Sequence, residues 1–187
     1  AMTVDDATRA GTGFDRPRPV PANLVPDLNH VNAFTTDAIV SGVVDSFAPW
    51  SRERATTLGA QVWHPRTLKA ARDAQRHVPE LRTLDRVGDE VHEVDFHPAY
   101  HELMSLAFGS GVHALAWTSD EPGAHTARAA LSYLWNQVDG STACPTGMAY
   151  ASIPILRSLP ELAPWAERVA AHDYDPAYAP IGTKRAA

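Results

Sequence analysis

The densest group of chemically active side chains lies around His97 and His101, in the run His-Glu-Val-Asp-Phe-His-Pro-Ala-Tyr-His-Glu. Two histidines four residues apart on one helical face, with a neighbouring carboxylate, would be a ligand set for zinc. However, His97 precedes Pro98, where a helix is expected to begin, so its ring can instead cap the first turn. Because the His-Glu-x-x-His arrangement is absent, we favour structural capping and packing over a metal site.

The single cysteine is the second candidate. Cys144 precedes Pro145, where we expect a helix to begin, and a helix N-terminus lowers the pKa of a thiol. A thiolate nucleophile also needs a base, and no histidine lies near Cys144 in the sequence, although the fold could supply one. A buried or pocket-lining thiol is the better interpretation. One cysteine and no apolar N-terminal segment also lead us to expect a cytoplasmic protein.

Composition and charge argue against several classes of function. The chain has 187 residues, a net charge of −6 and a pI near 5.8. Its 16 Lys and Arg residues are scattered, whereas phosphate binding needs clustered basic side chains, so we do not expect nucleic acid as a partner. No apolar run approaches the length of a transmembrane helix, so no membrane is expected either. The sequence contains neither a Gly-x-Ser-x-Gly elbow nor a complete dinucleotide loop, and residue chemistry alone gives no catalytic centre.

The elements that would position these side chains are mostly helical. Apolar residues recur at helical spacing from Ile39 to Phe47, with Thr36 as a candidate N-cap. Gly140 should close a long helix, and Pro154 should kink or end a later one. Periodicity, proline starts and glycine ends predict further helices over residues 50–62, 65–74, 98–108, 124–138, 145–155 and 162–169.

One segment breaks the helical pattern. Val87-Gly88-Asp89 is typical of a turn between two short strands, the first of which we place at Leu84–Arg86. Two strands alone are marginally stable, so the hairpin should lean on another part of the chain. Residues 1–22 are polar and rich in Gly and Pro, which predicts an extended or disordered arm before a domain over residues 23–187. We therefore expect an all-α helical bundle with one short β-hairpin.

Longer segments of the chain resemble a known family. Examples are Val-Asp-Phe-His-Pro-Ala-Tyr-His from Val94, Tyr-Leu-Trp-Asn-Gln-Val from Tyr133, and the Tyr-Asp-Pro that begins at Tyr174. Together with residues 79–93, 122–131 and 144–154, these segments cover about residues 30 to 185 in order and without large gaps. They resemble the acyl-CoA dehydrogenase family, in its adaptive-response AidB-like branch.

The resemblance implies an N-terminal helical domain of the acyl-CoA dehydrogenase type, which the family follows with a β-rich domain and a C-terminal four-helix domain. In this family FAD is held chiefly by the two later domains, with help from a neighbouring subunit. The carboxylate that removes the α-proton of the substrate belongs to the C-terminal domain. We therefore assign no catalytic residue here. We expect FAD, an acyl-CoA-type substrate and a homo-oligomer only for a longer parent protein, an oxidoreductase of CH–CH bonds.

The sequence departs from the family after Lys184-Arg185, where the family continues into the Gly-Gly-Ser-Asp segment of its flavin-binding β-domain. We expect a fragment that supplies one wall of the acyl pocket and part of the oligomer contacts, without binding FAD alone. Two alternatives remain open. The chain could be a stand-alone helical interaction module, or one subunit of a split dehydrogenase.

The helix entered near Cys144 is the part expected to face the acyl or flavin cavity, because it mixes small polar and apolar side chains beside a proline. Plain core packing would explain the same residues equally well. The residues expected nearest the cavity are Thr142, Cys144, Thr146, Met148 and Tyr150.

Overall fold

The computed structural model describes residues 23, 28 and 31–186, so the arm expected over residues 1–22 lies outside the described residues. The described part is an α-helical bundle with one antiparallel hairpin, which confirms the predicted fold class. Its α-helices are α1 Ala38–Phe47, α2 Arg52–Val62, α3 Pro65–Arg76, α4 Pro98–Gly109, α5 Leu115–Thr118, α6 Ala124–Trp135, α7 Gly140–Arg157 and α8 Ala163–Ala170. The strands are β1 Glu80–Leu84 and β2 Glu90–Asp95, and short 3-10 turns cover Pro49–Ser51, Pro160–Leu162 and Ile181–Thr183.

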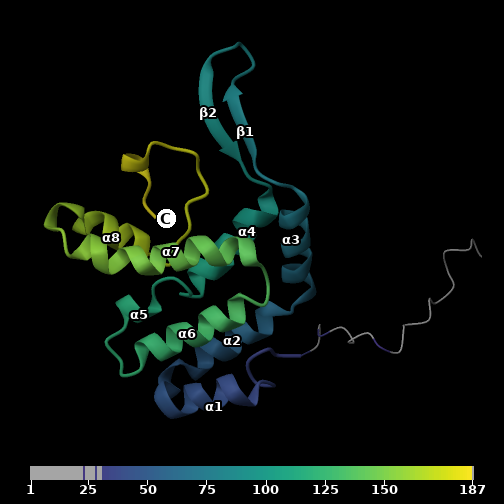
Figure 1. Cartoon of the computed structure of the whole chain (residues 1–187), viewed down its shortest axis with the longest axis vertical. Coiled ribbons are helices and arrows are strands. Elements are labelled where there is room, and N and C mark those ends of the chain that lie inside the picture. Colours follow the sequence, from purple (N-terminus) through teal and green to yellow (C-terminus); the bar gives the residue numbers. More distant parts are fainter. Residues whose placement is uncertain (1–22, 24–27, 29–30, 187) are drawn as a thin grey trace, which may run out of the picture.

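The helices pack in pairs rather than around a single axis. Helices α1 and α2 both contact α6 in the lower half of the molecule, and α3 packs against α4 (Figure 1). Helix α7 lies above α1, α2 and α6 in this view, contacts α4, and runs beside α8. Two core clusters follow from this arrangement. The larger joins α1 to α4 and α6 around residues such as Trp135, Leu131 and Leu58, and the smaller lies between α5, α7 and α8 around Ile153.

The loop before α1 is fixed by close contact with α2. Phe34 is fully buried, and the backbone N–H of Ala33 donates to the carbonyl of Gly59 at 3.0 Å. A Cβ atom at Gly59 would lie only 2.4 Å from the side chain of Asn32 and 2.6 Å from that of Phe34. Gly59 is therefore the residue that lets the loop and α2 approach each other.

Helix α1 begins one residue later than expected. Asp37, not Thr36, is the N-cap, and its carboxylate accepts hydrogen bonds from the N–H groups of Ile39 and Val40 at 2.9 and 3.1 Å. The other carboxylate oxygen accepts from the hydroxyl of Tyr133 at 2.9 Å, which ties the start of α1 to α6. Hydrogen bonding to the Val40 N–H, the Tyr133 hydroxyl and the Ile39 N–H lowers the pKa of Asp37.

Helix α7 shows that our prediction for Gly140 was wrong. It begins at Gly140, which was expected to close the preceding helix, and so starts five residues before Pro145. The cause is Asp139, whose carboxylate caps the new helix by accepting from the N–H of Thr142 at 3.1 Å. A kink or an end was expected at Pro154, and the helix continues through Pro154 to Arg157, so it does not end there.

The hairpin exists, but its first strand was placed too late. Strand β1 ends at Leu84 because Asp85 belongs to the turn, where its carboxylate accepts from the N–H groups of Val87 and Asp89 at 2.8 and 2.9 Å. The hairpin projects from the helical body (Figure 1). It leans on the segment after α8, because the hydroxyl of Tyr178 donates to the carbonyl of His92 at 3.0 Å.

We predict that Gly59→Ala lowers the free energy of unfolding by about 2–3 kcal/mol, because the new methyl group overlaps the buried loop. The matched control is Gly147→Ala in α7, where a Cβ meets nothing within 4 Å. That variant should be neutral or gain up to about 1 kcal/mol from helix propensity. Chemical denaturation of both variants checks this, and equal effects would contradict the close approach at Gly59.

Candidate functional site

Helix α7 presents two different faces. Thr142, Thr146 and Ile153 are at most 2% exposed and point into the body of the molecule. On the opposite side Cys144, Met148, Ala151 and Ile155 are exposed, at spacings of four, three and four residues. Met148 is 68% exposed and Ile155 is 63% exposed. We call these four residues the α7 outer face; it is a continuous apolar stripe that the described part of the chain leaves uncovered.

A buried hydrogen-bond network sets the rotation of α7. Trp135 is fully buried, and its indole N–H donates to the hydroxyl of Thr142 at 3.1 Å. That hydroxyl also lies 3.1 Å from the carboxylate of Asp139, which accepts from Gln75 in α3 at 3.2 Å. Burial raises the pKa of Asp139, but hydrogen bonds from Ser141, Gln75 and the Thr142 N–H outweigh it, and the pKa lies below its ordinary value. The network joins α3, α6 and α7.

The five residues predicted at the cavity therefore lie on different sides of α7. Thr142 and Thr146 face the core, and the hydroxyl of Thr146 donates to the carbonyls of Thr142 and Ala143 at 3.0 and 2.9 Å. Cys144 and Met148 lie on the α7 outer face, and Tyr150 is half-buried at its side. The helical spacing that links Cys144 and Met148 to Ala151 and Ile155 was readable in the sequence. That spacing predicts that Cys144 and Met148 lie on one side of the helix, away from Thr142 and Thr146.

Tyr150 belongs to an aromatic cluster between α5, α6 and α7. Its hydroxyl lies 2.9 Å from Nδ1 of His125, and the guanidinium of Arg128 lies 3.9 Å from the centre of its ring. The ring of Trp117 stacks on Tyr150 with 5.4 Å between centroids. No sequence motif marks this cluster, because its members are up to 33 residues apart.

The cluster also explains how α7 passes through Pro154. A proline has no N–H, so the carbonyl four residues earlier, that of Tyr150, loses its helical donor. The indole N–H of Trp117 donates to this carbonyl at 2.9 Å and replaces the missing bond. Tyr150 is thus held by its carbonyl, its ring and its hydroxyl.

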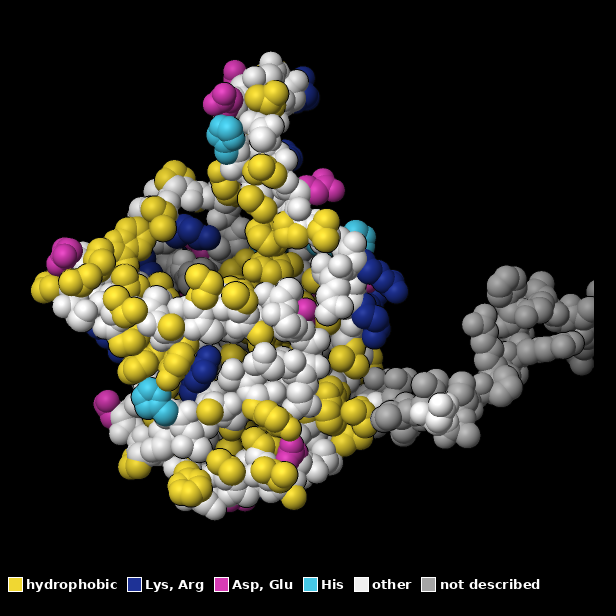
Figure 2. Space-filling view, viewed as in Figure 1, with side chains coloured by type: hydrophobic (Ala, Val, Ile, Leu, Met, Phe, Trp, Pro, Cys, Tyr) yellow, Lys and Arg dark blue, Asp and Glu magenta, His cyan; other side chains and the backbone are white. Residues whose placement is uncertain are grey.

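The face of the molecule that carries α7 is rich in apolar side chains. In Figure 2, hydrophobic side chains gather at the left over α8, below the hairpin and over α1 at the base, with separate ones over α7 between them. Helix α1 contributes an exposed stripe of its own, Ile39, Val43 and Phe47, which are 81%, 40% and 64% exposed. Large exposed apolar stripes of this kind usually mark contacts with other protein surfaces or ligands.

The histidines that suggested zinc have structural partners. His97 caps α4, since its Nδ1 accepts from the N–H of Ala99 at 3.2 Å, which confirms the capping prediction. Nδ1 of His101 is hydrogen-bonded to the hydroxyl of Tyr174 at 2.8 Å. Across the described residues, three or more His, Cys, Asp or Glu side chains nowhere come close enough to hold a metal ion. Likewise, no helix of the described part is long and apolar enough to cross a membrane.

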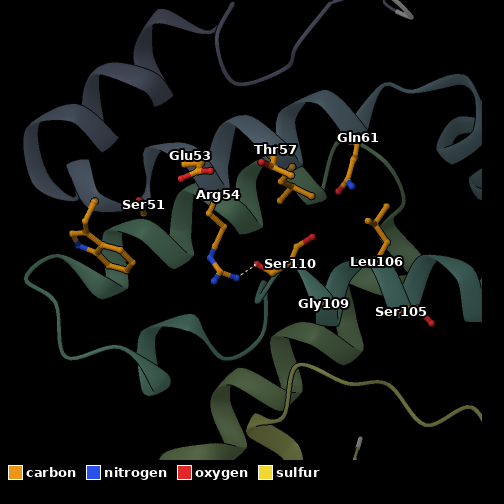
Figure 3. A pocket seen from close by; sticks show the side chains of 11 residues that line it. Ser51, Glu53, Arg54, Thr57, Gln61, Ser105, Leu106, Gly109 and Ser110 are labelled. Atoms are coloured by element: carbon orange, nitrogen blue, oxygen red, sulfur yellow. Dashed lines mark hydrogen bonds between the residues drawn. The ribbon is translucent and has the colours of Figure 1, made fainter.

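A separate open cleft lies between α2 and α4 (Figure 3). Its volume is about 550 Å³, and the guanidinium of Arg54 crosses it to donate to the carbonyl of Ser110 at 3.3 Å. Its walls mix polar side chains with apolar ones, and Trp50, Leu58 and Leu106 are the apolar ones. The guanidinium of Arg54 lies within this cleft, whereas the α7 outer face is a continuous apolar stripe, and we take that face as the candidate site.

A buried histidine anchors the segment that follows α8. His113 is fully buried, stacks on Phe108 with 4.0 Å between ring centroids, and its Nε2 lies 2.9 Å from the carbonyl oxygen of Ala171. Its Nδ1 has no partner among the described residues. Burial lowers the pKa of His113 to about 4, with His172 and Arg128 as smaller contributors, so the ring is neutral near pH 7.

The chain matches the family described as the adaptive response protein AidB N-terminal domain over residues 23–176. The chain belongs to this family. The acyl-CoA dehydrogenase-like protein AidB of Escherichia coli (strain K12) is 34% identical in an alignment of 178 residues that covers 93% of this chain and 31% of that protein. The chain therefore spans about a third of the length of this relative. The resemblance seen in the sequence is confirmed.

Two solved structures share the fold of this AidB-type domain. Bd2924 in its apo-form has a TM-score of 0.70 at 18% identity, covering 76% of this chain and 30% of that one. Caenorhabditis elegans ACDH-11, in complex with C11-CoA, has a TM-score of 0.66 at 17% identity, covering 84% of this chain and 29% of that one. At these identities the likeness shows the helical fold, and it is consistent with the family match.

We predict that the stability of the domain rises with pH between about 4 and 6.5. In that window the unfolded His113, with a pKa near 6.5, binds a proton that the folded ring with a pKa of about 4 does not bind. The neutral ring's contribution, about 3 kcal/mol at most, is present above pH 6.5 and lost as pH falls toward 4. Denaturation at several pH values measures this.

His113→Phe should be less stable at pH 7, because the carbonyl of Ala171 loses the contact with His113, but its stability should depend much less on pH. The control is His92→Asn, at an exposed position with a positive φ of 46°, which asparagine tolerates. In the control, the free energy of unfolding should change with pH as steeply as it does in the native protein. If the stability of His113→Phe depended on pH as steeply as that of the native protein, His113 would not be the source of the pH dependence.

Proposed function

We propose that this chain is the N-terminal helical domain of an FAD-dependent, acyl-CoA dehydrogenase-type oxidoreductase, and that it supplies a wall of the acyl side of the active-site cavity. The wall is the α7 outer face with Tyr150 beside it. The rest of the protein, in the same chain or in a separate one, supplies the flavin site and the catalytic carboxylate. Self-association and a cytoplasmic location belong to the same proposal; the single cysteine supports the latter.

The observation that carries the proposal is the two-faced burial of α7. One side is fixed in the core through Thr142 and Thr146, while Met148 and Ile155 on the other side remain more than half exposed. A helix with a second apolar side gains stability only when something apolar covers that side. An acyl chain or an apolar domain surface would do so. The family match and the acyl-CoA complex of the structurally similar ACDH-11 support an acyl ligand.

We do not expect the α7 outer face to hold a flavin by itself. A dinucleotide needs a cradle of backbone N–H groups or basic side chains for its pyrophosphate. The α7 outer face offers apolar side chains, and the nearest basic residue on the helix is Arg157 at its last turn, whose guanidinium is paired with Glu167 at 3.1 Å. This chain can therefore cover an apolar part of a bound molecule, and we assign it no catalytic residue.

We predict that Met148→Asp weakens acyl-CoA binding about tenfold or more, because a carboxylate at the wall must lose its water when an acyl chain packs against it. The protein to test carries this chain together with the flavin-binding domains. Calorimetric titration with a medium-chain acyl-CoA measures the affinity. The matched control is Val87→Asp in the hairpin turn, since Val87 and Met148 are both 68% exposed.

The control should bind acyl-CoA like the native protein, and circular dichroism should show that both variants are folded. Equal affinities for the two variants would contradict the proposed wall. If this chain and the flavin-binding domains do not associate at all, this chain is not part of a dehydrogenase. The stand-alone interaction module then becomes the better assignment, with the same outer face as its contact surface.

A further inference from the structure

The hairpin is an exposed, acidic projection. Every residue of β1 is exposed, and no residue of β2 is buried. Residues 80–95 contain six acidic and two basic side chains, a net charge of −4 out of the −6 of the whole chain. The acidic residues are Glu80, Asp85, Asp89, Glu90, Glu93 and Asp95. A surface with this charge favours a basic partner.

The solvent face of α3 carries the opposite charge. Arg66, Lys69, Arg72 and Arg76 are all exposed, while Thr67, Ala70 and Ala71 on the other side of the helix are buried. With Asp73 included, the helix has a net charge of +3. Arg66 pairs with Glu102 at 2.6 Å and Lys69 pairs with Asp73. Within residues 31–186, neither Arg72 nor Arg76 has an ion-pair partner.

These two surfaces do not face each other within one molecule. The strands run away from the helical body, and the basic side chains lie below the base of the hairpin (Figures 1 and 2). Acidic side chains lie at the upper end of the hairpin, farther from the helical body, although Lys or Arg side chains also lie on the hairpin. Since one chain carries both surfaces, a second copy offers each of them its complement.

The hairpin also has apolar surface to bury. Leu81 and Val94 face each other across the strands and are 65% and 43% exposed, and Leu84 is 55% exposed. A two-stranded sheet of this length is marginally stable when nothing covers it. The aliphatic stems of arginine and lysine on α3 can cover such side chains while their charged ends reach the carboxylates.

We propose that the hairpin of one copy docks on the solvent face of α3 in a second copy, and that the second hairpin docks on the first α3 in return. The result is a two-fold symmetric dimer in which each contact occurs twice. This deepens the proposed self-association by naming its surface. It does not depend on the acyl-side role of the α7 outer face.

Charge reversal on each surface tests the dimer. One variant of the chain carries Asp89→Lys and Glu90→Lys at the tip of the hairpin, and the other carries Arg72→Glu and Arg76→Glu on α3. Each should raise the dimer dissociation constant about tenfold, measured by sedimentation equilibrium. The variant that combines all four substitutions should return to within about threefold of the native value, because every reversed charge again meets its opposite.

Raising the salt concentration from about 0.05 M to about 0.5 M should weaken the native dimer, as expected for exposed ion pairs. The variant Met148→Asp serves as the control, since it changes the α7 outer face alone and should leave this dimer intact. Loss of acyl-CoA binding with an intact dimer, or the reverse, therefore separates the two proposals.

Any of three results overturns the dimer proposal. Reversed charges that leave the dissociation constant unchanged would show that the two surfaces do not meet. Weakening by each pair without recovery in the combined variant would show that they contact something other than each other. If the hairpin variant loses affinity for the flavin-binding domains while the dimer persists, those domains are the partner of the hairpin and the proposal is wrong.

Discussion

The buried indole of Trp135 is the constraint on which the arrangement of this domain depends. A fully buried N–H must find an acceptor, and here the acceptor is the hydroxyl of Thr142. Thr142 can reach the indole N–H only because Asp139 caps α7, so that the helix begins at Gly140 and its first turn faces α6. Once that rotation is fixed, the positions four, seven and eleven residues after Cys144 all lie on the outside. The exposed stripe of α7 is therefore a consequence of how the core satisfies one tryptophan.

Polar groups that are hydrogen-bonded inside the fold have a structural role, and the surfaces that stay exposed are the ones available to a ligand or a partner. The polar groups of Asp139, Thr142 and Thr146 and the Nε2 of His113 are bound within the fold. The surfaces left over are apolar on α7 and α1, acidic on the hairpin and basic on α3. A domain with this distribution is suited to contact other protein surfaces and to cover an apolar ligand. Among its buried titratable groups, Asp139 is held by hydrogen bonds within the fold and His113 is held neutral.

Much of the fold could be predicted from the sequence. Apolar periodicity gave the helices, and Pro65 and Pro98 marked the true first residues of α3 and α4. The errors arose where a carboxylate decided the local structure. Asp37, Asp85 and Asp139 each accept backbone N–H bonds, and these fixed the start of α1, the turn of the hairpin and the start of α7. For the candidate site, spacing alone could have grouped Cys144 with Met148. No local pattern could have brought His125 to Tyr150, because that contact depends on how α6 and α7 cross.

The position of Cys144 has a practical consequence. It is the only cysteine in the 187 residues, and it is exposed on the first third of the α7 outer face. A thiol-reactive dye or spin label would attach to this chain at that face without any engineered substitution. The label would sit one helical turn from Met148, close to whatever covers the stripe. The molecule thus carries a natural attachment point for reporting, by fluorescence or by distance measurement, when this surface becomes occupied.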